Sequence, residues 1–408
     1  MKCRHCAHPL THNFLDLGSA PPSNAYLPAV ALQLPEVWLP LKLMVCEACW
    51  LVQTLDFAGR EALFDADYAY FSSCSSTWLK HAENFVTTMQ QELKLNAESL
   101  VLEVAANDGY LLQYVQQAGI PCFGIEPTTS TANAARAKGI SIIERFFGTE
   151  LAKELAAQGK VVDLTVANNV LAHVPDINDF VSGFAHLLKP RGVASFEFPH
   201  LLNMVQQNQF DTAYHEHYSY LSLHAVKTIF ERNGLSVFDV QEWPTHGGSL
   251  RVLAQRRDCL PYPVTERVAR ILAKEQSAGM TEIGFYQDVQ NRAEQAKFAL
   301  LRFLLDCKSK GLRVAAYGAA AKGNTLLNFS GVRPDLLPYV VDVNSHKQGK
   351  YLPGSRIPIV DLAYLLADRP DMVLILPWNL QDEIMHDLRQ IRTWQGRFVR
   401  AIPDLQII

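Results

Sequence analysis

Short apolar segments alternate with helical segments through the middle of the chain. The first apolar segment, 99–104, is followed by a turn of small residues and then by a helical run. Regular repetition of strand and helix predicts a doubly wound α/β domain with a mainly parallel sheet. The expected strands cover residues 99–104, 121–125, 141–143, 162–167 and 193–198, and the expected helices cover 110–117, 149–158 and 177–188.

A second alternation follows a helical region at 267–310, in which apolar residues recur at helical spacing. A turn of small residues at 318–323 separates the first strand of this alternation from its first helix, as in a Rossmann-like unit. The expected strands here are 313–317, 339–343 and 372–376, and the expected helix is 324–330.

The first fifty residues have little apolar periodicity but contain two C-x-x-C pairs, Cys3 with Cys6 and Cys46 with Cys49. Two such pairs supply the four thiolates of a closed, tetrahedral structural zinc site. A metal would provide folding energy that a segment rich in loop-forming residues lacks. A thioredoxin-like redox pair and chance placement are the alternatives. We therefore expect a zinc-binding module at 1–66, a central domain at 67–256 and a C-terminal domain at 257–408.

Composition narrows the class of protein. The chain has 408 residues, of which 49% are hydrophobic and 19% charged, enough for a large core divided among two or three domains. Its formal net charge of −4 argues against a nucleic-acid partner held by bulk electrostatics. No apolar run reaches the length of a membrane span, and no signal-peptide segment is recognisable. We expect a cytoplasmic protein with no membrane partner.

The turn after the first central strand indicates a cofactor. It contains Asn107, Asp108 and Gly109, and it lies at the carboxyl end of its strand, where doubly wound sheets bind ligands. The next strand ends in Glu126, which is suited to binding the two hydroxyls of a ribose. A carboxylate in the turn would repel a pyrophosphate but suits the cationic S-adenosylmethionine. An ordinary strand-turn-helix with surface acids is the alternative.

The segment 210–220 is rich in chemically useful side chains, among them Tyr214, Glu216 and His217. Histidine titrates near neutral pH, and a tyrosine can donate to a developing oxyanion, so this segment favours general acid–base catalysis. His173 follows another central strand and should face the same edge of the sheet. A second metal site, a nucleophile–base pair and an aromatic core segment are the alternatives.

Taken together, these motifs resemble those of the nucleotide-sugar C-methyltransferase family along nearly the whole chain. The resemblance rests on the two C-x-x-C pairs, Glu103 to Gly109, the Tyr-x-Glu-His segment at 214–217, and the stretches 68–73, 246–251 and 318–325. It implies a class I methyltransferase domain flanked by a zinc-binding module and a C-terminal Rossmann-like domain. The implied reaction methylates C-3 of a 4-keto-6-deoxyhexose attached to a nucleoside diphosphate. The implied cofactors are S-adenosylmethionine and a structural zinc ion.

The C-terminal domain is expected to bind the nucleoside diphosphate, because small residues and Lys322 surround a helix N-terminus. A purely structural lobe is the alternative.

For the whole chain, the competing functions are a non-catalytic nucleotide-sugar-binding protein and an NAD-dependent sugar oxidoreductase. The oligomeric state is expected to be a monomer or a small homo-oligomer. The expected catalytic residues are His217, Tyr214, Glu216 and His173; the expected cofactor-binding residues are Glu103, Ala105, Asn107, Asp108, Gly109, Glu126 and Asn168; the expected substrate-binding residues are Tyr70, Ser73, His246, Gly247, Lys322, Asn324, Asp342, Asn344 and Lys347; and the expected metal ligands are Cys3, Cys6, Cys46 and Cys49.

Overall fold

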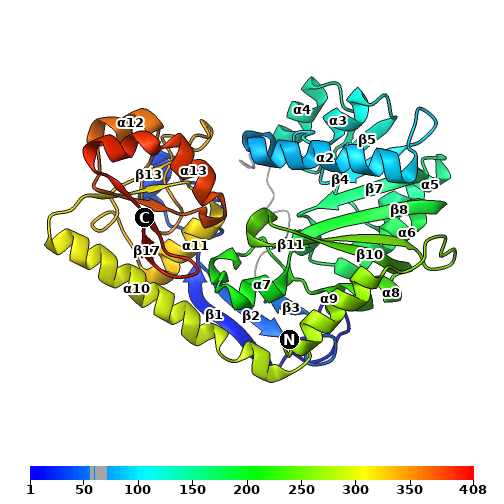
Figure 1. The fold of residues 1–408 in the computed structure, drawn as a ribbon, viewed down its shortest axis with the longest axis horizontal. Coiled ribbons are helices and arrows are strands. Elements are labelled where there is room, and N and C mark those ends of the chain that lie inside the picture. The colour runs from blue at the N-terminus through cyan, green and yellow to red at the C-terminus, as the bar shows by residue number, and fades with distance from the viewer. Residues whose placement is uncertain (56–58, 60–70) are drawn as a thin grey trace.

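The computed structural model describes residues 1–55, 59 and 71–408, which form two α/β lobes (Figure 1). The N-terminal strands and one long helix, α10 (Val289–Ser309), run along the side that joins the lobes. Three sheets of four, seven and six strands organise the described residues. None of their helices has the length and apolarity that a membrane span requires.

The four-stranded sheet belongs mainly to the N-terminal module. Its antiparallel strands follow the order β1-β2-β3-β9. The last strand comes from the central part of the chain, immediately after the segment that contains His217. The zinc module and this segment are therefore joined by backbone hydrogen bonds. The strands are β1 (His12–Ala20), β2 (Leu39–Val45), β3 (Val52–Thr54) and β9 (Ser219–Tyr220).

The seven-stranded sheet has the order β10-β11-β8-β7-β4-β5-β6. Successive strands add on one side of β4 up to β6 and then on its other side from β7, so the gap between β4 and β7 is the switch point at which such sheets bind ligands. The expected strands are present, and five of the seven strands are parallel. The strands are β4 (Val101–Val104), β5 (Cys122–Ile125), β6 (Ile142–Ile143), β7 (Val162–Asn168), β8 (Leu188–Pro199), β10 (Leu235–Trp243) and β11 (Ser249–Arg256).

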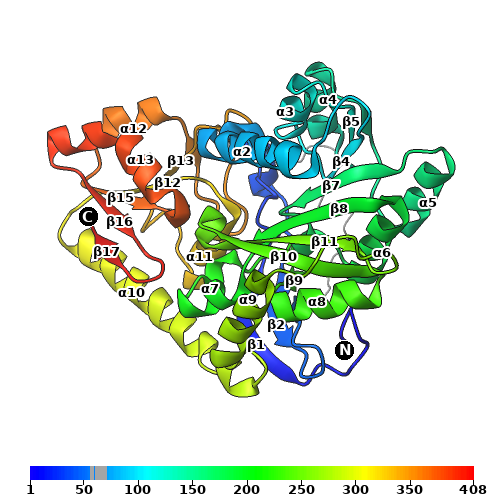
Figure 2. The ribbon, with the colours of Figure 1, turned by 45° about the vertical axis from the view of Figure 1, so that its right-hand side comes forward.

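Two strands of this sheet are absent from the sequence-based prediction. β10 and β11 extend the sheet in antiparallel fashion beyond β8, which the prediction took as the last strand of the domain. Helices cover both faces, with α2 on one face and α6 and α8 on the other (Figure 2). The helices of this part are α2 (Ser76–Leu93), α3 (Leu112–Gln117), α4 (Thr129–Ala137), α5 (Thr149–Ala157), α6 (Ile177–Leu187), α7 (Leu201–Gln206), α8 (Leu223–Arg232) and α9 (Glu266–Ser277).

The six-stranded sheet forms the C-terminal lobe, with the order β14-β13-β12-β15-β16-β17. All neighbouring pairs are parallel except β16 with β17, so the Rossmann-like prediction is correct. Its elements are β12 (Val314–Tyr317), α11 (Ala321–Ser330), β13 (Val340–Val341), β14 (Ile359–Val360), α12 (Leu362–Asp368), β15 (Met372–Ile375), α13 (Gln381–Asp387), β16 (Arg397–Arg400) and β17 (Gln406–Ile407).

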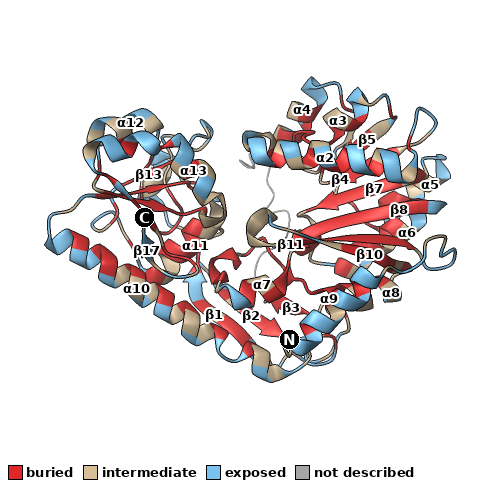
Figure 3. Ribbon diagram, in the orientation of Figure 1, coloured by how far each residue is buried: buried red, intermediate tan, exposed pale blue. Residues whose placement is uncertain are grey.

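The described residues of the N-terminal module share their buried core with the rest of the chain. Leu15 and Leu43 of its sheet share one buried cluster with Leu300 and Leu304 of α10 and with Leu326 of α11. Figure 3 shows the strands of all three sheets largely buried and the outer faces of the helices exposed. Because the module packs on the C-terminal lobe and its sheet includes β9, it connects the two lobes.

Candidate active site

The four N-terminal cysteines form one cluster with the geometry of a zinc site. Their sulfur atoms all lie within 4.8 Å of one another. The Sγ–Sγ distances are 3.6 Å for Cys3 with Cys49 and 3.6 Å for Cys6 with Cys46. A tetrahedral ion with Zn–S bonds of about 2.3 Å places its sulfurs roughly 3.8 Å apart, so the four thiolates fit a structural zinc ion.

The two C-x-x-C knuckles have the same backbone turn. Ala7 and Trp50 follow the second cysteine of each pair, and both have a left-handed conformation with φ of 64° and 59°. The backbone N–H of Ala7 donates to the carbonyl of Cys3, and that of Trp50 donates to the carbonyl of Cys46. The repeated turn directs both thiols of each knuckle toward one centre.

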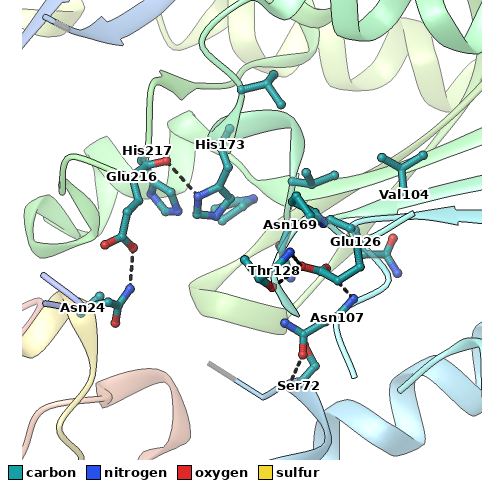
Figure 4. A pocket seen from close by; sticks show the side chains of 18 of the residues that line it. Asn24, Ser72, Val104, Asn107, Glu126, Thr128, Asn169, His173, Glu216 and His217 are labelled. Atoms are coloured by element: carbon teal, nitrogen blue, oxygen red, sulfur yellow. Dashed lines mark hydrogen bonds between the residues drawn. The ribbon is translucent and has the colours of Figure 1, made fainter. Parts of the chain in front are cut away.

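One cavity of about 310 Å³ lies at the carboxyl ends of the central strands and extends to the C-terminal lobe (Figure 4). Its wall combines the three groups of residues that the sequence suggested. The predicted residues that line it are Ala105, Asn107, Glu126 and Asn168 from the cofactor set, His173, Tyr214, Glu216 and His217 from the catalytic set, and His246, Lys322 and Lys347 from the substrate set.

Glu126 defines the cofactor end of this cavity. One carboxylate oxygen accepts the backbone N–H of Asn107 at 2.9 Å, and the other accepts the backbone N–H of Thr128 at 3.0 Å and its hydroxyl (Figure 4). Burial raises the pKa of Glu126 despite these bonds. Asn107 is held in turn by the backbone N–H of Ser72, which donates to its side-chain oxygen at 2.9 Å. The carboxylate is thereby fixed at the cavity wall with lone pairs left for hydroxyl donors.

The turn between β4 and α3 has an unusual backbone. Ala105 and Asn107 have positive φ angles of 58° and 50°, which side-chain-bearing residues rarely adopt. Gly109 has φ of 75°, and a Cβ there would lie 2.3 Å from Ile140, so a larger residue would be excluded both by conformation and by space. Strained backbone of this kind is commonly kept where a ligand approaches a loop closely.

Glu103 and Asp108 lie behind the cavity wall. Glu103 is 1% exposed, and desolvation raises its pKa well above the usual range. Asp108 accepts the backbone N–H of Ser73 at 3.2 Å and has the Lys138 ammonium group 3.7 Å away. Asp108 is therefore the acid of this turn that can act on a ligand through its charge, because burial favours the neutral form of Glu103.

His217 is held in a single tautomer. Its Nδ1 lies 3.0 Å from the carbonyl oxygen of Thr212, which can only accept, so Nδ1 carries the proton. Its Nε2 lies 2.7 Å from the Tyr214 hydroxyl and accepts from it. Burial, together with the neighbouring His173, lowers the pKa of His217 well below its usual value. The ring is therefore neutral near pH 7, with its basic nitrogen facing the phenol.

His173 lies beside His217, with the ring centroids 4.5 Å apart. Its Nδ1 donates to the backbone carbonyl of Glu216 at 2.9 Å (Figure 4). Enclosure in the cavity wall lowers the pKa of His173 to about 4 by desolvation. Two neutral histidines thus share one side of the cavity, each fixed by a backbone carbonyl.

Glu216 faces a residue that the sequence did not suggest. The Asn24 side chain, from the N-terminal module, donates to the Glu216 carboxylate (Figure 4). Burial raises the pKa of Glu216 to about 7, so this carboxyl exchanges a proton near neutral pH. The Pro21–Pro22 pair just before Asn24 is the only local signal that this loop has a defined shape.

Two lysines form the end of the cavity that belongs to the C-terminal lobe. Desolvation lowers the pKa of Lys322 to about 8, and its ammonium group donates to Asn379 at 2.6 Å and lies 4.3 Å from the centre of the Trp378 ring. Burial disfavours the charged form of Lys347, but Tyr26 and Asp342 beside it raise its pKa above the usual value. Both lysines lie where an anionic group could meet them.

Several residues of the predicted substrate set support the site from outside the cavity wall. Asn324 donates to the Ser23 carbonyl at 3.1 Å and so holds the loop before Asn24. Asp342 accepts the backbone N–H of Ala319 at 2.8 Å. Asn344 accepts the backbone N–H of His346, Ser73 accepts from Lys138, and Gly247 packs against Trp378 and accepts from Gln209. Tyr70 lies outside the described residues.

The wall also contains residues that the sequence reasoning missed. Trp78 of α2 stacks on Tyr110 with a centroid distance of 5.7 Å and contacts the edge of His246 at 5.0 Å. The Asn169 side chain lies 3.0 Å from Nε2 of His246. Of these missed residues only Asn169 had a sequence signal, because it directly follows a strand at the edge where ligands bind.

Three family models match successive parts of the chain. The model described as "Putative zinc binding domain" matches residues 3–64, "Methyltransferase domain" matches 80–240, and "C-methyltransferase C-terminal domain" matches 244–403. The four-cysteine cluster lies within the first of these, and the Tyr214–His217 segment within the second.

The chain is also similar to individual known proteins. The chain is 33% identical to C-methyltransferase NovU of Streptomyces niveus over 407 residues, which covers 100% of this chain and 96% of that protein. Magnesium protoporphyrin IX methyltransferase of Synechocystis PCC 6803, solved with bound SAM, is 18% identical and covers 44% of this chain and 79% of its own, with a TM-score of 0.34. The PH0226 protein of Pyrococcus horikoshii OT3 is 13% identical and covers 46% and 95%, with a TM-score of 0.38. The full-length match and the three family models show that the chain is a methyltransferase of the C-methyltransferase family, with a zinc-binding N-terminal domain.

Proposed function

We propose that this methyltransferase uses S-adenosylmethionine to methylate C-3 of a nucleoside-diphosphate 4-keto-6-deoxyhexose. The observation that supports this best is the single cavity, which joins the Glu126 end to the Tyr214–His217 pair and to Lys322. A cofactor and a second nucleoside-bearing ligand could therefore meet within one enclosed space. Sugar methylation at carbon needs such a meeting point together with a base.

The cofactor end suits S-adenosylmethionine. When bound, this cofactor supplies a methyl group on a positively charged sulfur. The Glu126 carboxylate would accept hydrogen bonds from the two ribose hydroxyls, because its protein partners leave lone pairs unused. Asp108 places a carboxylate in the turn, which favours a cationic ligand over a pyrophosphate.

His217 would remove the proton from C-3. The neighbouring C-4 ketone acidifies that proton. As the Tyr214 hydroxyl turns its hydrogen from Nε2 to the C-4 oxygen, the C–H bond breaks, the proton moves to the freed Nε2, and the electron pair passes to the C-4 oxygen as an enolate. The neutral tautomer of His217 is the form that accepts a proton. A negative enolate beside the ring would raise the pKa of His217 during the step, which strengthens a base whose pKa is otherwise low.

Tyr214 and His173 would stabilise the oxygen at C-4. Charge develops on this oxygen in the transition state, and donors that are already oriented lower its energy. Glu216 holds His173 through its backbone carbonyl, while its carboxyl group, paired with Asn24, is available to a sugar hydroxyl. The C-3 hydrogen would then face His217, and the C-4 oxygen would face Tyr214 and His173.

Lys322 and Lys347 would bind the diphosphate. Both border the cavity at the start of the C-terminal lobe, and Lys322 lies in the first turn of α11, where the helix dipole also favours anions. A nucleoside beyond the diphosphate would rest on the C-terminal sheet.

Two measurements test this proposal: binding of the cofactor product and hydrogen exchange at C-3 of the sugar. We expect S-adenosylhomocysteine, and not NAD, to raise the thermal midpoint. With S-adenosylhomocysteine bound, we expect deuterium from solvent to enter C-3 of at least one 4-keto nucleotide sugar in a panel. Stabilisation by NAD alone would instead support an oxidoreductase. Binding without exchange at C-3 across the panel would support a non-catalytic sugar-binding protein.

A further inference from the structure

Arg4 stands between two metal ligands, Cys3 and Cys6, yet its side chain reaches the loops of the active site. One guanidinium nitrogen, Nη1, donates to the carbonyl of Pro175 at 2.8 Å. The other, Nη2, donates to the carbonyl of Thr54 at 3.0 Å. The guanidinium carbon lies 5.2 Å from the centre of the Tyr218 ring.

Pro175 and Tyr218 belong to the two segments that contain the catalytic histidines, and Thr54 of β3 is hydrogen-bonded to the second of these segments. Pro175 closes the segment that begins at His173 and, like it, lines the cavity. The Thr54 hydroxyl donates to the backbone carbonyl of His217 at 3.1 Å, and the Thr54 backbone N–H donates to the carbonyl of Tyr218 at 3.1 Å. One guanidinium therefore spans from the His173 loop to the strand that holds the His217 segment.

The zinc cluster fixes Arg4 from the other side. The Arg4 backbone N–H donates to the side-chain oxygen of Gln53 at 2.8 Å, and the Gln53 amide nitrogen donates to Sγ of Cys3 at 3.2 Å. Gln53 lies in β3, which pairs with β9 immediately after His217. Closure of the four thiolates on a metal would therefore restrain Arg4 through both flanking ligands and through Gln53.

We propose that Arg4 is a positioning residue, through which the zinc module keeps the imidazoles of His173 and His217 at their working separation. The rings are 4.5 Å apart, and each is oriented by a backbone carbonyl, so a small shift of either loop changes the geometry of the pair. Arginine suits this task because its rigid planar group donates to the two carbonyls from two separate nitrogens, whereas a lysine has one nitrogen on a flexible chain. The consequence for methyl transfer rests on the proposed function, but the effect on the imidazoles does not.

The test compares Arg4→Met and Arg4→Lys with Lys2→Met, a matched control that removes an exposed charge beside Cys3. We expect Arg4→Met to retain one zinc per chain and to lower kcat about 10- to 100-fold, with the KM for S-adenosylmethionine within about twofold of wild type. Arg4→Lys should recover part of the loss, and Lys2→Met should match the wild type. Nitrogen-15 spectra of the imidazoles, assigned with His173→Asn and His217→Asn, should show both rings shifted in Arg4→Met, less shifted in Arg4→Lys and unshifted in Lys2→Met.

Unchanged kcat and unshifted imidazole signals in zinc-loaded Arg4→Met would overturn the proposal, and so would equal losses in Arg4→Met and Lys2→Met. If Arg4→Met does not fold, Arg4→Lys decides: a lower kcat with shifted rings supports the proposal, and wild-type values overturn it. If the wild type methylates no sugar, the proposed function fails, while the imidazole shifts still decide the role of Arg4.

Discussion

The Tyr214 hydroxyl donates a hydrogen bond of 2.7 Å to Nε2 of His217, and Nδ1 of the same ring donates to the Thr212 carbonyl. Both ring nitrogens are therefore hydrogen-bonded. Nδ1 is a donor, and Nε2, the basic nitrogen, accepts from the phenol. Nε2 can accept a substrate proton once the phenol turns its hydrogen to another acceptor. This pair explains why a Tyr-x-Glu-His segment, with its members three residues apart, can act as a unit.

Substitution of each member of the pair should distinguish the role of the base, His217, from the role of the phenol, Tyr214. We expect His217→Asn to abolish deuterium exchange at C-3 of the keto sugar with S-adenosylhomocysteine bound, because the basic nitrogen proposed to accept the proton is removed. Tyr214→Phe should keep part of the exchange but lower turnover about 10- to 1000-fold, the range for loss of an oriented donor to an oxyanion. Normal exchange in His217→Asn would exclude His217 as the base, and near-normal turnover of Tyr214→Phe would remove the phenol from the reaction.

Glu126 should determine cofactor affinity. Glu126→Gln keeps the shape of the side chain but exchanges a charged acceptor for a neutral amide with one accepting oxygen. We expect the Kd for S-adenosylhomocysteine, measured by calorimetry, to rise about 10- to 100-fold, the value of charged hydrogen bonds. Glu144→Gln, at an exposed acid after the next strand, is the control and should bind as the wild type does. Equal affinity in both variants would remove Glu126 from the cofactor site.

Lys322 should make diphosphate binding depend on pH. Its pKa of about 8 in the free protein means that the ammonium form is lost as the pH rises through 8. A bound phosphate favours the ammonium form and raises the pKa of Lys322, so affinity should fall above pH 8 by up to about tenfold per pH unit. Lys322→Met should bind nucleoside diphosphates more weakly at pH 7 and remove this dependence, whereas Lys310→Met, at the exposed C-terminal end of α10, should do neither. A pH dependence that persists in Lys322→Met would assign it to another group.

Glu216 should make stability depend on pH. Burial raises the pKa of this carboxyl to about 7, above the value of 4.5 expected in the unfolded chain. Its protonated form therefore contributes stability that is fully present below pH 4.5 and is lost as the pH rises through about 7. Glu216→Gln keeps a neutral side chain at every pH, so it should stabilise the protein at pH 8 relative to wild type by about 1 to 3 kcal/mol, with little difference at pH 4.5. Denaturant unfolding at the two pH values measures this, and an equal difference at both would contradict it.

The zinc cluster should hold the N-terminal module together. Because the described residues of the module share their buried core with the rest of the chain, loss of the metal removes much of its folding energy. We expect Cys46→Ser to lose the bound zinc, measured by atomic emission, and to lower the thermal midpoint. Cys259→Ser, which changes an exposed cysteine outside the cluster, should keep one zinc per chain and the wild-type midpoint. Full zinc content in Cys46→Ser would exclude the four-thiolate site.

Features encoded in short stretches of sequence could be predicted. Each C-x-x-C knuckle, the strand and turn around Asn107, and the Tyr214–His217 segment owe their shape to neighbouring residues, so the sequence located them. The parallel strands were recognisable because each is a short apolar run between turn-forming residues.

Contacts between distant segments could not be predicted. Asn24, Trp78 and Arg4 reach the site only because the N-terminal sheet takes in β9 and because α2 packs over the cavity. Loop residues give no periodic signal of the partner they will meet. The strand β10 is hard to predict for a related reason: an edge strand that is polar at several positions, such as Leu235–Trp243, is hard to tell from a loop.

The position of the transferred methyl group tests the central claim most directly. Wild-type enzyme is incubated with S-adenosylmethionine labelled with carbon-13 at the methyl group and with a panel of nucleoside-diphosphate 4-keto-6-deoxyhexoses, and the product is analysed by NMR. We expect the labelled methyl to be bonded to C-3 and to show long-range couplings to C-2 and to the C-4 carbonyl. A labelled methyl on oxygen or nitrogen, or no transfer to any sugar of the panel while S-adenosylmethionine binds, would contradict the proposed reaction.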